Sequence, residues 1–274
     1  MLIGHLDLAA QPYVVMGILN LTPDSFSDGG LYLDVDTAVG RALQMVSEGA
    51  DIIDIGGEST RPGAQPLNAD DEIARVVPVV KALRKKSDVA ISVDTSKAQV
   101  MKAAVDAGAN LINDVRALQE DGALQVAADM SMPVCLMHMQ GQPRSMQHKP
   151  EYKHVVSEVL NFLKHRIKAC ENVGISRDQI ILDPGFGFGK TLEHNLSLLK
   201  HLSEFVNMGL PVLMGISRKS MLGHITGAEV DQRLEAGLAT TVLGFQTGVR
   251  IFRVHDVKET VEVLKVCHAV DVVK

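Results

Sequence analysis

The feature that most constrains the fold of this chain is a strict alternation of short apolar runs with longer amphipathic segments. The runs are rich in β-branched residues and end at polar or glycine residues, as buried strands do. In the longer segments, apolar residues recur at helical spacing. The predicted strands are 14–19, 51–55, 89–93, 110–113, 134–137, 180–182, 212–215 and 249–254. The predicted helices are 36–48, 70–85, 97–107, 120–130, 152–173, 194–206, 231–246 and 256–270.

This alternation predicts parallel strand pairing, because parallel strands need a crossover connection that is usually a helix. Eight such units within 274 residues match a (β/α)8 TIM barrel. A doubly wound open sheet is the alternative, but it typically has a glycine-rich turn after its first strand, and none follows Leu19. We therefore predict an α/β fold with one domain over 1–274, a single TIM barrel, in which residues 1–12 form an N-terminal cap or hairpin.

Charge and cysteine usage narrow the setting of the protein. A net charge of −6 gives no general attraction to nucleic acid or to an anionic membrane, so we expect neither as a partner. Three cysteines without a CxxC pair are typical of free thiols in a reducing compartment. No signal peptide or membrane-length apolar run is evident. We expect a cytoplasmic protein.

Every predicted strand ends in a polar or ionisable group. In a TIM barrel the active site forms at the carboxyl ends of the strands and in the loops that follow them. These ends carry Asn20, the segment GGESTRPG, Asp94, Asn113, His138, Asp183, the segment SRKS and the segment RVHD. Carboxylates, amides and cations that converge on one mouth predict a ligand site there.

Several of these residues have structural alternatives. Asp94 and Asp183 precede helices and could accept hydrogen bonds as N-caps, although Pro184 and a glycine loop after Asp183 argue against a cap. Asn20 and Asn113 could be turn residues. His138, between two methionines, is more typical of a satisfied core histidine.

The last predicted strand carries two cationic candidates. Arg253 and His255 are two residues apart, so both point to the same side of the strand. Asp256 begins a helix, whose free N–H groups suit an anion, and Arg218 and Lys219 follow the preceding strand. Barrels often hold phosphate in this region, so we expect an anion site.

Two carboxylate questions stay open at this stage. Arg253 could instead pair with a carboxylate inside the barrel. Asp54, within the second strand, could be either a buried structural group or a ligand contact.

The segment GFGFGKT after Asp183 resembles a Walker A loop but fails its pattern, because Pro184 stands where the first glycine is required. We interpret it as a flexible loop whose aromatic side chains cover a flat ligand. Carboxylates and amides suit the N–H edge of a heterocycle, and the cations suit a phosphate or diphosphate. The predicted ligand is a heterocycle that bears a diphosphate leaving group.

Eight motifs in order carry a resemblance: LNLTPDSFSDGG, DIGGESTRPGA, SVDTSKAQV, INDVRAL, LMHMQGQP, LDPGFGFGKT, GISRKSMLG and RVHDVKETV. Together they resemble bacterial dihydropteroate synthase, in its monofunctional form, across nearly the whole chain. The resemblance implies a transferase of folate biosynthesis that joins 6-hydroxymethyl-7,8-dihydropterin diphosphate to 4-aminobenzoate and releases diphosphate. It also implies a cytoplasmic homodimer, Mg²⁺ as cofactor and sulfonamides as inhibitors.

The resemblance also implies site residues, which we carry over motif by motif. The catalytic residues would be Asp94, Asp183, Lys219, Arg253 and His255. The pterin would contact Asp94, Asn113, Val115, Met137, Asp183, Phe188, Gly215 and Lys219. The diphosphate would contact Asn20, Arg253 and His255, and Mg²⁺ would bind Asn20 and Asp28. The aminobenzoate would contact Phe26, Thr60, Arg61, Pro62, Ser217 and Lys219.

The implied mechanism is a dissociative, SN1-like loss of diphosphate, although the residues alone do not exclude direct displacement. Residues 21–30, with Phe26 and Asp28, are predicted to form a mobile loop. The rival hypotheses are a pterin-binding methyltransferase barrel that uses methyltetrahydrofolate, and a non-catalytic pterin-binding paralogue. The Arg253–His255 pair and the SRKS segment favour the synthase.

Overall fold

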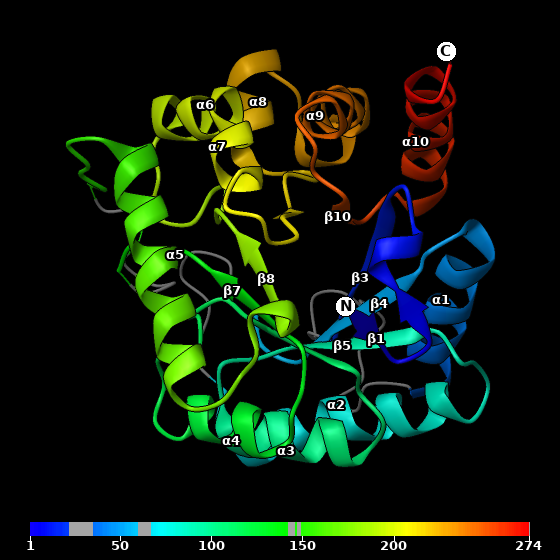
Figure 1. Cartoon of the computed structure of the whole chain (residues 1–274). Coiled ribbons are helices and arrows are strands. Elements are labelled where there is room, and N and C mark those ends of the chain that lie inside the picture. Colours follow the sequence, from blue (N-terminus) through cyan, green and yellow to red (C-terminus); the bar gives the residue numbers. More distant parts are fainter. Residues whose placement is uncertain (22–34, 60–66, 142–145, 147–148, 274) are drawn as a thin grey trace.

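The computed structural model describes residues 1–21, 35–59, 67–141, 146 and 149–273. Its main sheet is an eight-stranded parallel sheet in the order β8-β7-β6-β5-β4-β3-β10-β9. The Leu182 N–H donates to the Pro211 carbonyl at 2.9 Å, and Leu182 pairs with Val212 just before β9. The sheet therefore curves into a nearly closed barrel with helices on its outside (Figure 1), and the predicted TIM barrel is confirmed.

The strands lie close to their predicted positions. They are β3 (Val14–Asn20), β4 (Ile52–Gly56), β5 (Ala90–Asp94), β6 (Leu111–Asp114), β7 (Val134–Met137), β8 (Ile180–Asp183), β9 (Leu213–Met214) and β10 (Ile251–Val254). The helices are α1 (Val35–Glu48), α2 (Ala69–Arg84), α3 (Ala98–Asp106), α4 (Ala123–Asp129), α5 (Val155–Asn172), α6 (Leu192–Lys200), α7 (Leu202–Val206), α8 (Ser220–Thr226), α9 (Leu234–Gln246) and α10 (Val257–Asp271).

One helical prediction was wrong, and one helix was not predicted. The single helix expected over 194–206 is divided at His201, whose backbone leaves the helical region, and this bend lets Leu202 and Phe205 pack into the core. Helix α8 was missed because seven residues are too short to display a helical period. It ends at Gly227, whose positive φ of 75° is typical of a helix C-terminus.

Alternate residues of each strand face opposite sides of the barrel wall, which separates two apolar clusters. The larger cluster lies between strands and helices and contains Val15, Ile53 and Phe252. The smaller cluster fills the inside of the barrel near the amino ends of the strands, with Met16 and Ile52 among its members. This inner cluster is the floor beneath the polar mouth.

The N-terminal residues pair as an antiparallel hairpin of β1 (Leu2–Ile3) and β2 (Leu6–Asp7). Ile3 is fully buried and belongs to the inner apolar cluster. The hairpin therefore covers the barrel at the end away from the polar mouth. No helix in the described part of the chain is long and apolar enough to cross a membrane.

Candidate active site

Polar side chains inside the barrel form a layer directly above the apolar floor. On each strand the residue two positions after a floor residue faces the same side. Ile52 is thus followed by Asp54, Leu111 by Asn113, Ile181 by Asp183 and Ile251 by Arg253, and Asp94 lies one step higher on β5. The period of the strands therefore brings together residues that lie up to about two hundred positions apart in the chain.

Arg253 is the centre of this layer. Its Nε donates to Asp54 Oδ2 at 2.6 Å, and its Nη2 donates to Asp94 Oδ2 at 2.7 Å. Asn113 Nδ2 also donates to Asp54 Oδ2, at 3.1 Å. The alternative that Arg253 pairs with barrel carboxylates is therefore observed, and Asp54 proves to be the fully buried group that orients both Arg253 and Asn113.

Burial shifts the pKa values of the ionisable groups in this layer. It raises the pKa of Asp94 to about 7, although the nearby Arg253 guanidinium opposes the shift. The pKa of Asp183 is also raised by burial, against the attraction of Lys219. Burial lowers the pKa of Lys219 to about 8, and Asp183 opposes that shift. Burial therefore moves the pKa values of Asp94 and Lys219 towards neutral pH.

The loop after β8 places Asp183, Phe188 and Lys219 beside one another. The Gly185 N–H donates to Asp183 Oδ1 at 2.7 Å, so this carboxylate closes a turn of its own loop. Lys219 Nζ donates to the Phe186 carbonyl and lies 4.5 Å from the centre of the Phe188 ring. Asp183 is no helix cap, and its buried carboxylate remains part of the mouth.

The expectation that the aromatic side chains of this loop cover a ligand was wrong for Phe186, which is fully buried in the outer core. The loop is also tightly packed, because a Cβ at Gly185 would lie 1.9 Å from the His138 carbonyl oxygen. Gly185 has a positive φ of 71°, which glycine adopts without strain. Phe188 alone of the two phenylalanines is partly exposed at the mouth.

At the end of β10, His255 is joined to the loop after β9. His255 Nδ1 lies 3.0 Å from Ser217 Oγ, and the His255 N–H donates to the same oxygen at 3.2 Å. Asp256 stands at the N-cap position of α10 but makes no side-chain cap and pairs with Arg218 instead. Arg218 is thus neutralised by Asp256, and among the described residues Lys219 and Arg253 provide the positive charge of the mouth.

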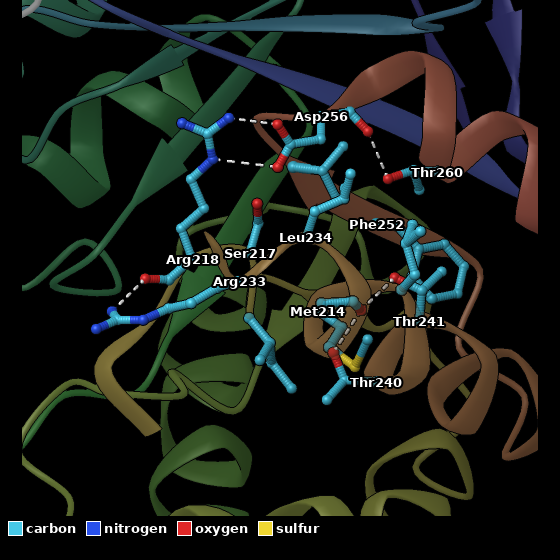
Figure 2. A pocket seen from close by; sticks show the side chains of 14 residues that line it. Met214, Ser217, Arg218, Arg233, Leu234, Thr240, Thr241, Phe252, Asp256 and Thr260 are labelled. Atoms are coloured by element: carbon cyan, nitrogen blue, oxygen red, sulfur yellow. Dashed lines mark hydrogen bonds and ion pairs between the residues drawn. The ribbon is translucent and has the colours of Figure 1, made fainter. Parts of the chain in front are cut away.

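Behind Ser217 a small cavity separates α9 from β9 and β10, and Figure 2 shows the side chains that line it. At its edge, Arg233 Nη1 donates to the Arg218 carbonyl at 3.0 Å, and Nε donates to Ala228 at 3.0 Å. The guanidinium passes so close to Gly223 that a Cβ there would lie 2.4 Å from Nη2. Arg233 therefore holds the segment that carries Ser217 and Lys219 in place. The sequence motifs gave no indication of this role for Arg233.

A second brace lies at the start of the segment after β4. Lys97 Nζ donates to Glu58 Oε2 and, at 2.6 Å, to Glu72 Oε2 on α2. Glu58 Oε1 accepts the Leu67 N–H at 3.3 Å. The Glu58 side chain therefore connects residue 58, before positions 60–66, to residue 67, after them. No sequence motif predicts this cluster of one lysine and two glutamates, because the three residues lie on separate segments.

The structure places some of the remaining predicted site residues, and the others lie outside the described ranges. Asn20 is half-buried at the end of β3, Val115 and Met137 are buried, and Gly215 follows β9. His138 is buried outside the mouth and contacts Lys190, as the core alternative expects. Phe26, Asp28, Thr60, Arg61 and Pro62, together with the rest of the predicted mobile loop from 22 to 30, lie outside the described residues.

Comparison with known proteins identifies the family to which this chain belongs. Residues 16–255 match the family described as "Pterin binding enzyme". Dihydropteroate synthase of Escherichia coli strain K12 is 51% identical over 264 residues, which cover 96% of this chain and 93% of the relative. The chain belongs to the dihydropteroate synthase family. It is accordingly a transferase, and the resemblance drawn from the eight motifs is confirmed.

Solved structures agree with this assignment. The Yersinia pestis dihydropteroate synthase, crystallised with a sulfonamide drug, has a TM-score of 0.93 and 52% identity, and the match covers 98% of this chain and 97% of that one. The Xanthomonas albilineans dihydropteroate synthase in complex with 7,8-dihydropteroate has a TM-score of 0.89 and 45% identity, with 98% and 97% coverage. The barrel described above is therefore the fold of this family.

Proposed function

We propose that this chain condenses 6-hydroxymethyl-7,8-dihydropterin diphosphate with 4-aminobenzoate to give 7,8-dihydropteroate and diphosphate. The observation that carries the proposal is the inward polar layer, in which Arg253 lies between Asp54 and Asp94. Such a layer offers acceptors for a heterocycle and a cation for a leaving group in one cavity. The 7,8-dihydropteroate held by the Xanthomonas relative is the product of this reaction.

The pterin subsite is assigned to the buried polar residues and the apolar groups around them. Asp94 and Asp183 accept N–H groups of the ring edge, Asn113 both donates and accepts, and Lys219 donates. Asn113 and Asp183 are buried, and Asp94 and Lys219 are partly buried, so their hydrogen bonds are stronger than they would be in water. The faces of the ring contact Val115, Met137, Phe188 and Gly215, of which the last leaves room because it has no side chain.

The diphosphate subsite is assigned to Arg253, His255 and Asn20. The carboxylates of Asp54 and Asp94 fix the guanidinium of Arg253 through Nε and Nη2. Among the described residues no hydrogen bond is made by its Nη1, which can reach a phosphate oxygen. The contact between Ser217 Oγ and His255 Nδ1 fixes the orientation of the imidazole ring. It therefore also fixes the direction in which Nε2 points.

Magnesium is assigned to Asn20, with Asp28 as a second ligand. The half-buried Asn20 pairs in register with Gly56, which has no side chain, so its amide oxygen has room for a hard cation. No cluster of three or more His, Cys, Asp or Glu in the described residues could hold a metal by itself. Mg²⁺ commonly takes one or two protein ligands and completes its shell with water and substrate phosphates. When bound it neutralises charge on the diphosphate.

The aminobenzoate subsite is assigned to Ser217 and Lys219, together with Phe26, Thr60, Arg61 and Pro62. Ser217 and Lys219 lie beside the diphosphate and pterin subsites respectively, so an amine held there faces the carbon that joins them. Because the Yersinia relative binds a sulfonamide drug, we propose that sulfonamides compete for the same place on this chain.

The chemistry follows from the weak nucleophilicity of an aromatic amine. The C–O bond to the diphosphate breaks first, in a dissociative step, and its electron pair leaves with the diphosphate. The positive charge on the pterin methylene is stabilised through the ring by Asp94 and Asp183, and Arg253 and His255 stabilise the departing negative charge. The amine nitrogen then forms the C–N bond and loses its proton to solvent. Preorganised charges of this kind usually lower a barrier most.

The proposal is tested by mixing the protein with Mg²⁺, the pterin diphosphate and ¹⁴C-labelled 4-aminobenzoate. We expect labelled dihydropteroate and an equal amount of diphosphate. Labelled product that disappears when a sulfonamide is added supports the assigned aminobenzoate subsite. Folded protein that forms no labelled product contradicts the proposed function.

For assembly and location we propose a cytoplasmic homodimer. Apolar side chains exposed on α9 and α10, such as Leu243, Val266 and Val270, provide a face that a second copy could cover. The free cysteines, of which Cys135 and Cys170 are buried, fit a reducing compartment. Light scattering at micromolar concentration should give twice the mass of the chain, and a monomer would contradict the dimer.

A further inference from the structure

Lys190 is a buried lysine that the proposed reaction does not use. It follows the glycine loop after β8, and only 3% of the residue is exposed. Its Nζ donates to the Gly185 carbonyl at 2.8 Å and to the Phe188 carbonyl at 3.0 Å. It also lies 3.0 Å from His138 Nδ1 and 3.3 Å from the His138 carbonyl oxygen. Four acceptors therefore surround one amino group.

The hydrogen-bond partners of Lys190 match the donors of an ammonium, although burial opposes its charge. An ammonium has three N–H donors and no acceptor, which matches a shell of carbonyl oxygens and a ring nitrogen. Burial lowers the pKa of Lys190 well below its ordinary value, whereas Asp183 and the carbonyl oxygens favour the charged form. Burial and the adjacent Lys190 lower the pKa of His138 to about 3, so the imidazole is neutral and accepts at Nδ1.

The same contacts determine which way the loop backbone faces. The carbonyl groups of Gly185 and Phe188 point to Lys190, while the Gly185 N–H points to Asp183 and the Gly187 N–H donates to Asn195 at 2.7 Å. The loop also packs directly on the end of β7, since a Cβ at Gly185 would lie 1.9 Å from His138. The Lys190 side chain therefore links the loop to the end of β7, in addition to the direct packing of Gly185.

We propose that Lys190 is a positioning residue for the pterin subsite, acting from behind the loop without touching the substrate. Its ammonium organises the loop so that the Asp183 carboxylate and the Phe188 ring face the mouth. Through the Phe186 carbonyl, which accepts from Lys219, the same loop also determines where that catalytic ammonium lies. This inference rests on the proposed function for the identity of the ligand.

The direct test compares Lys190→Ala and Lys190→Met with Lys200→Ala, a matched control at an exposed position on α6. We expect the Kd of the pterin diphosphate, measured by calorimetry, to rise by about tenfold to a hundredfold in both Lys190 variants. The KM for aminobenzoate at saturating pterin should change much less. Lys200→Ala should match the wild type in both quantities.

Chemical rescue separates a missing cation from a missing side chain. In Lys190→Ala, n-propylammonium replaces the deleted part of the side chain, and n-propanol has nearly the same shape without the charge. We expect the ammonium, and not the alcohol, to restore pterin binding. Equal rescue by both compounds, or wild-type Kd and kcat in the folded variants, overturns the proposal.

A measurement on the wild-type protein does not depend on turnover or on folding of a variant. Nitrogen-15 NMR of labelled histidine should report the Nε2–H tautomer for His138, and labelled lysine should give a slowly exchanging ammonium signal. A neutral Lys190 amine or the opposite tautomer overturns the proposal even if the enzyme is active. Wild-type protein that makes no dihydropteroate but has these signals contradicts only the proposed function.

Discussion

Replacement of Asp54 by asparagine tests how far catalysis depends on a residue that is fully buried beneath the proposed pterin subsite. Asp54 Oδ2 accepts from Arg253 Nε at 2.6 Å and from Asn113 Nδ2 at 3.1 Å. Its Oδ1 is buried without a partner among the described residues. Asparagine keeps the shape, but it removes the charge and places an NH₂ group where no acceptor is available.

The magnitude follows from these contacts. A hydrogen bond to a charged group contributes about 1.5–3 kcal/mol and a neutral one about 0.5–1.5, and an unpaired buried polar group costs about 1–3 kcal/mol. We therefore expect Asp54→Asn to lower the free energy of unfolding by about 2–3 kcal/mol. Arg253 keeps its contact with Asp94, but the contact that fixes its Nε is weakened because the acceptor is no longer charged. A displaced guanidinium should reduce kcat/KM for the pterin diphosphate by about a hundredfold, or about 2.7 kcal/mol.

The assay is diphosphate release at several pterin concentrations, together with denaturant unfolding of the same samples. The matched control is Asp51→Asn, just before the same strand, where Asp51 Oδ2 accepts the Val15 N–H at 2.8 Å. The control should lose stability without losing kcat/KM, because it lies at the floor end of the barrel. Folded Asp54→Asn with wild-type kcat/KM, or an equal kinetic loss in Asp51→Asn, would show that Asp54 does not position Arg253 for catalysis.

Three further predictions follow. The profile of kcat/KM for the pterin substrate against pH should be bell-shaped. Asp94 becomes protonated as the pH falls through about 7, and Lys219 loses its proton as the pH rises through about 8. An alkaline limb that persists in Lys219→Arg would contradict the assignment of that limb to Lys219. Gly223→Ala should displace the Arg233 guanidinium and lower kcat/KM for aminobenzoate by about tenfold, while steady-state kinetics of Gly237→Ala, where a Cβ meets nothing within 4 Å, should equal the wild type. Removal of Mg²⁺ with EDTA should abolish diphosphate release and added Mg²⁺ should restore it; full turnover in EDTA would disprove the metal requirement.

Much of the fold could be predicted because strand and helix periods are local properties of the sequence. Asp94, Asn113, Asp183 and Arg253 could be placed at one mouth because they occur at the ends of apolar runs, and strand ends of a parallel barrel meet. The division at His201 and the short helix α8 could not be predicted, because tertiary packing and a seven-residue length leave no periodic signal.

The contacts within the site were less accessible to sequence analysis. Nothing local distinguishes Asp54, which holds Arg253, from an ordinary buried carboxylate, since the partner lies 199 positions away. Lys190 appeared only within the GFGFGKT segment, without a role of its own, and its carbonyl shell depends on how the loop folds back on β7. Such residues are defined by pairs of distant backbone positions, which composition and spacing do not encode.

The central claim is that Arg253, held by Asp54 and Asp94, stabilises the departing diphosphate. The most direct measurement is the rate of diphosphate release in a single turnover by Arg253→Ala, with both substrates saturating and folding verified by circular dichroism. We expect the rate to fall by about a thousandfold or more, with the same amount of labelled dihydropteroate formed per diphosphate. An unchanged rate of release at saturation would contradict the claim.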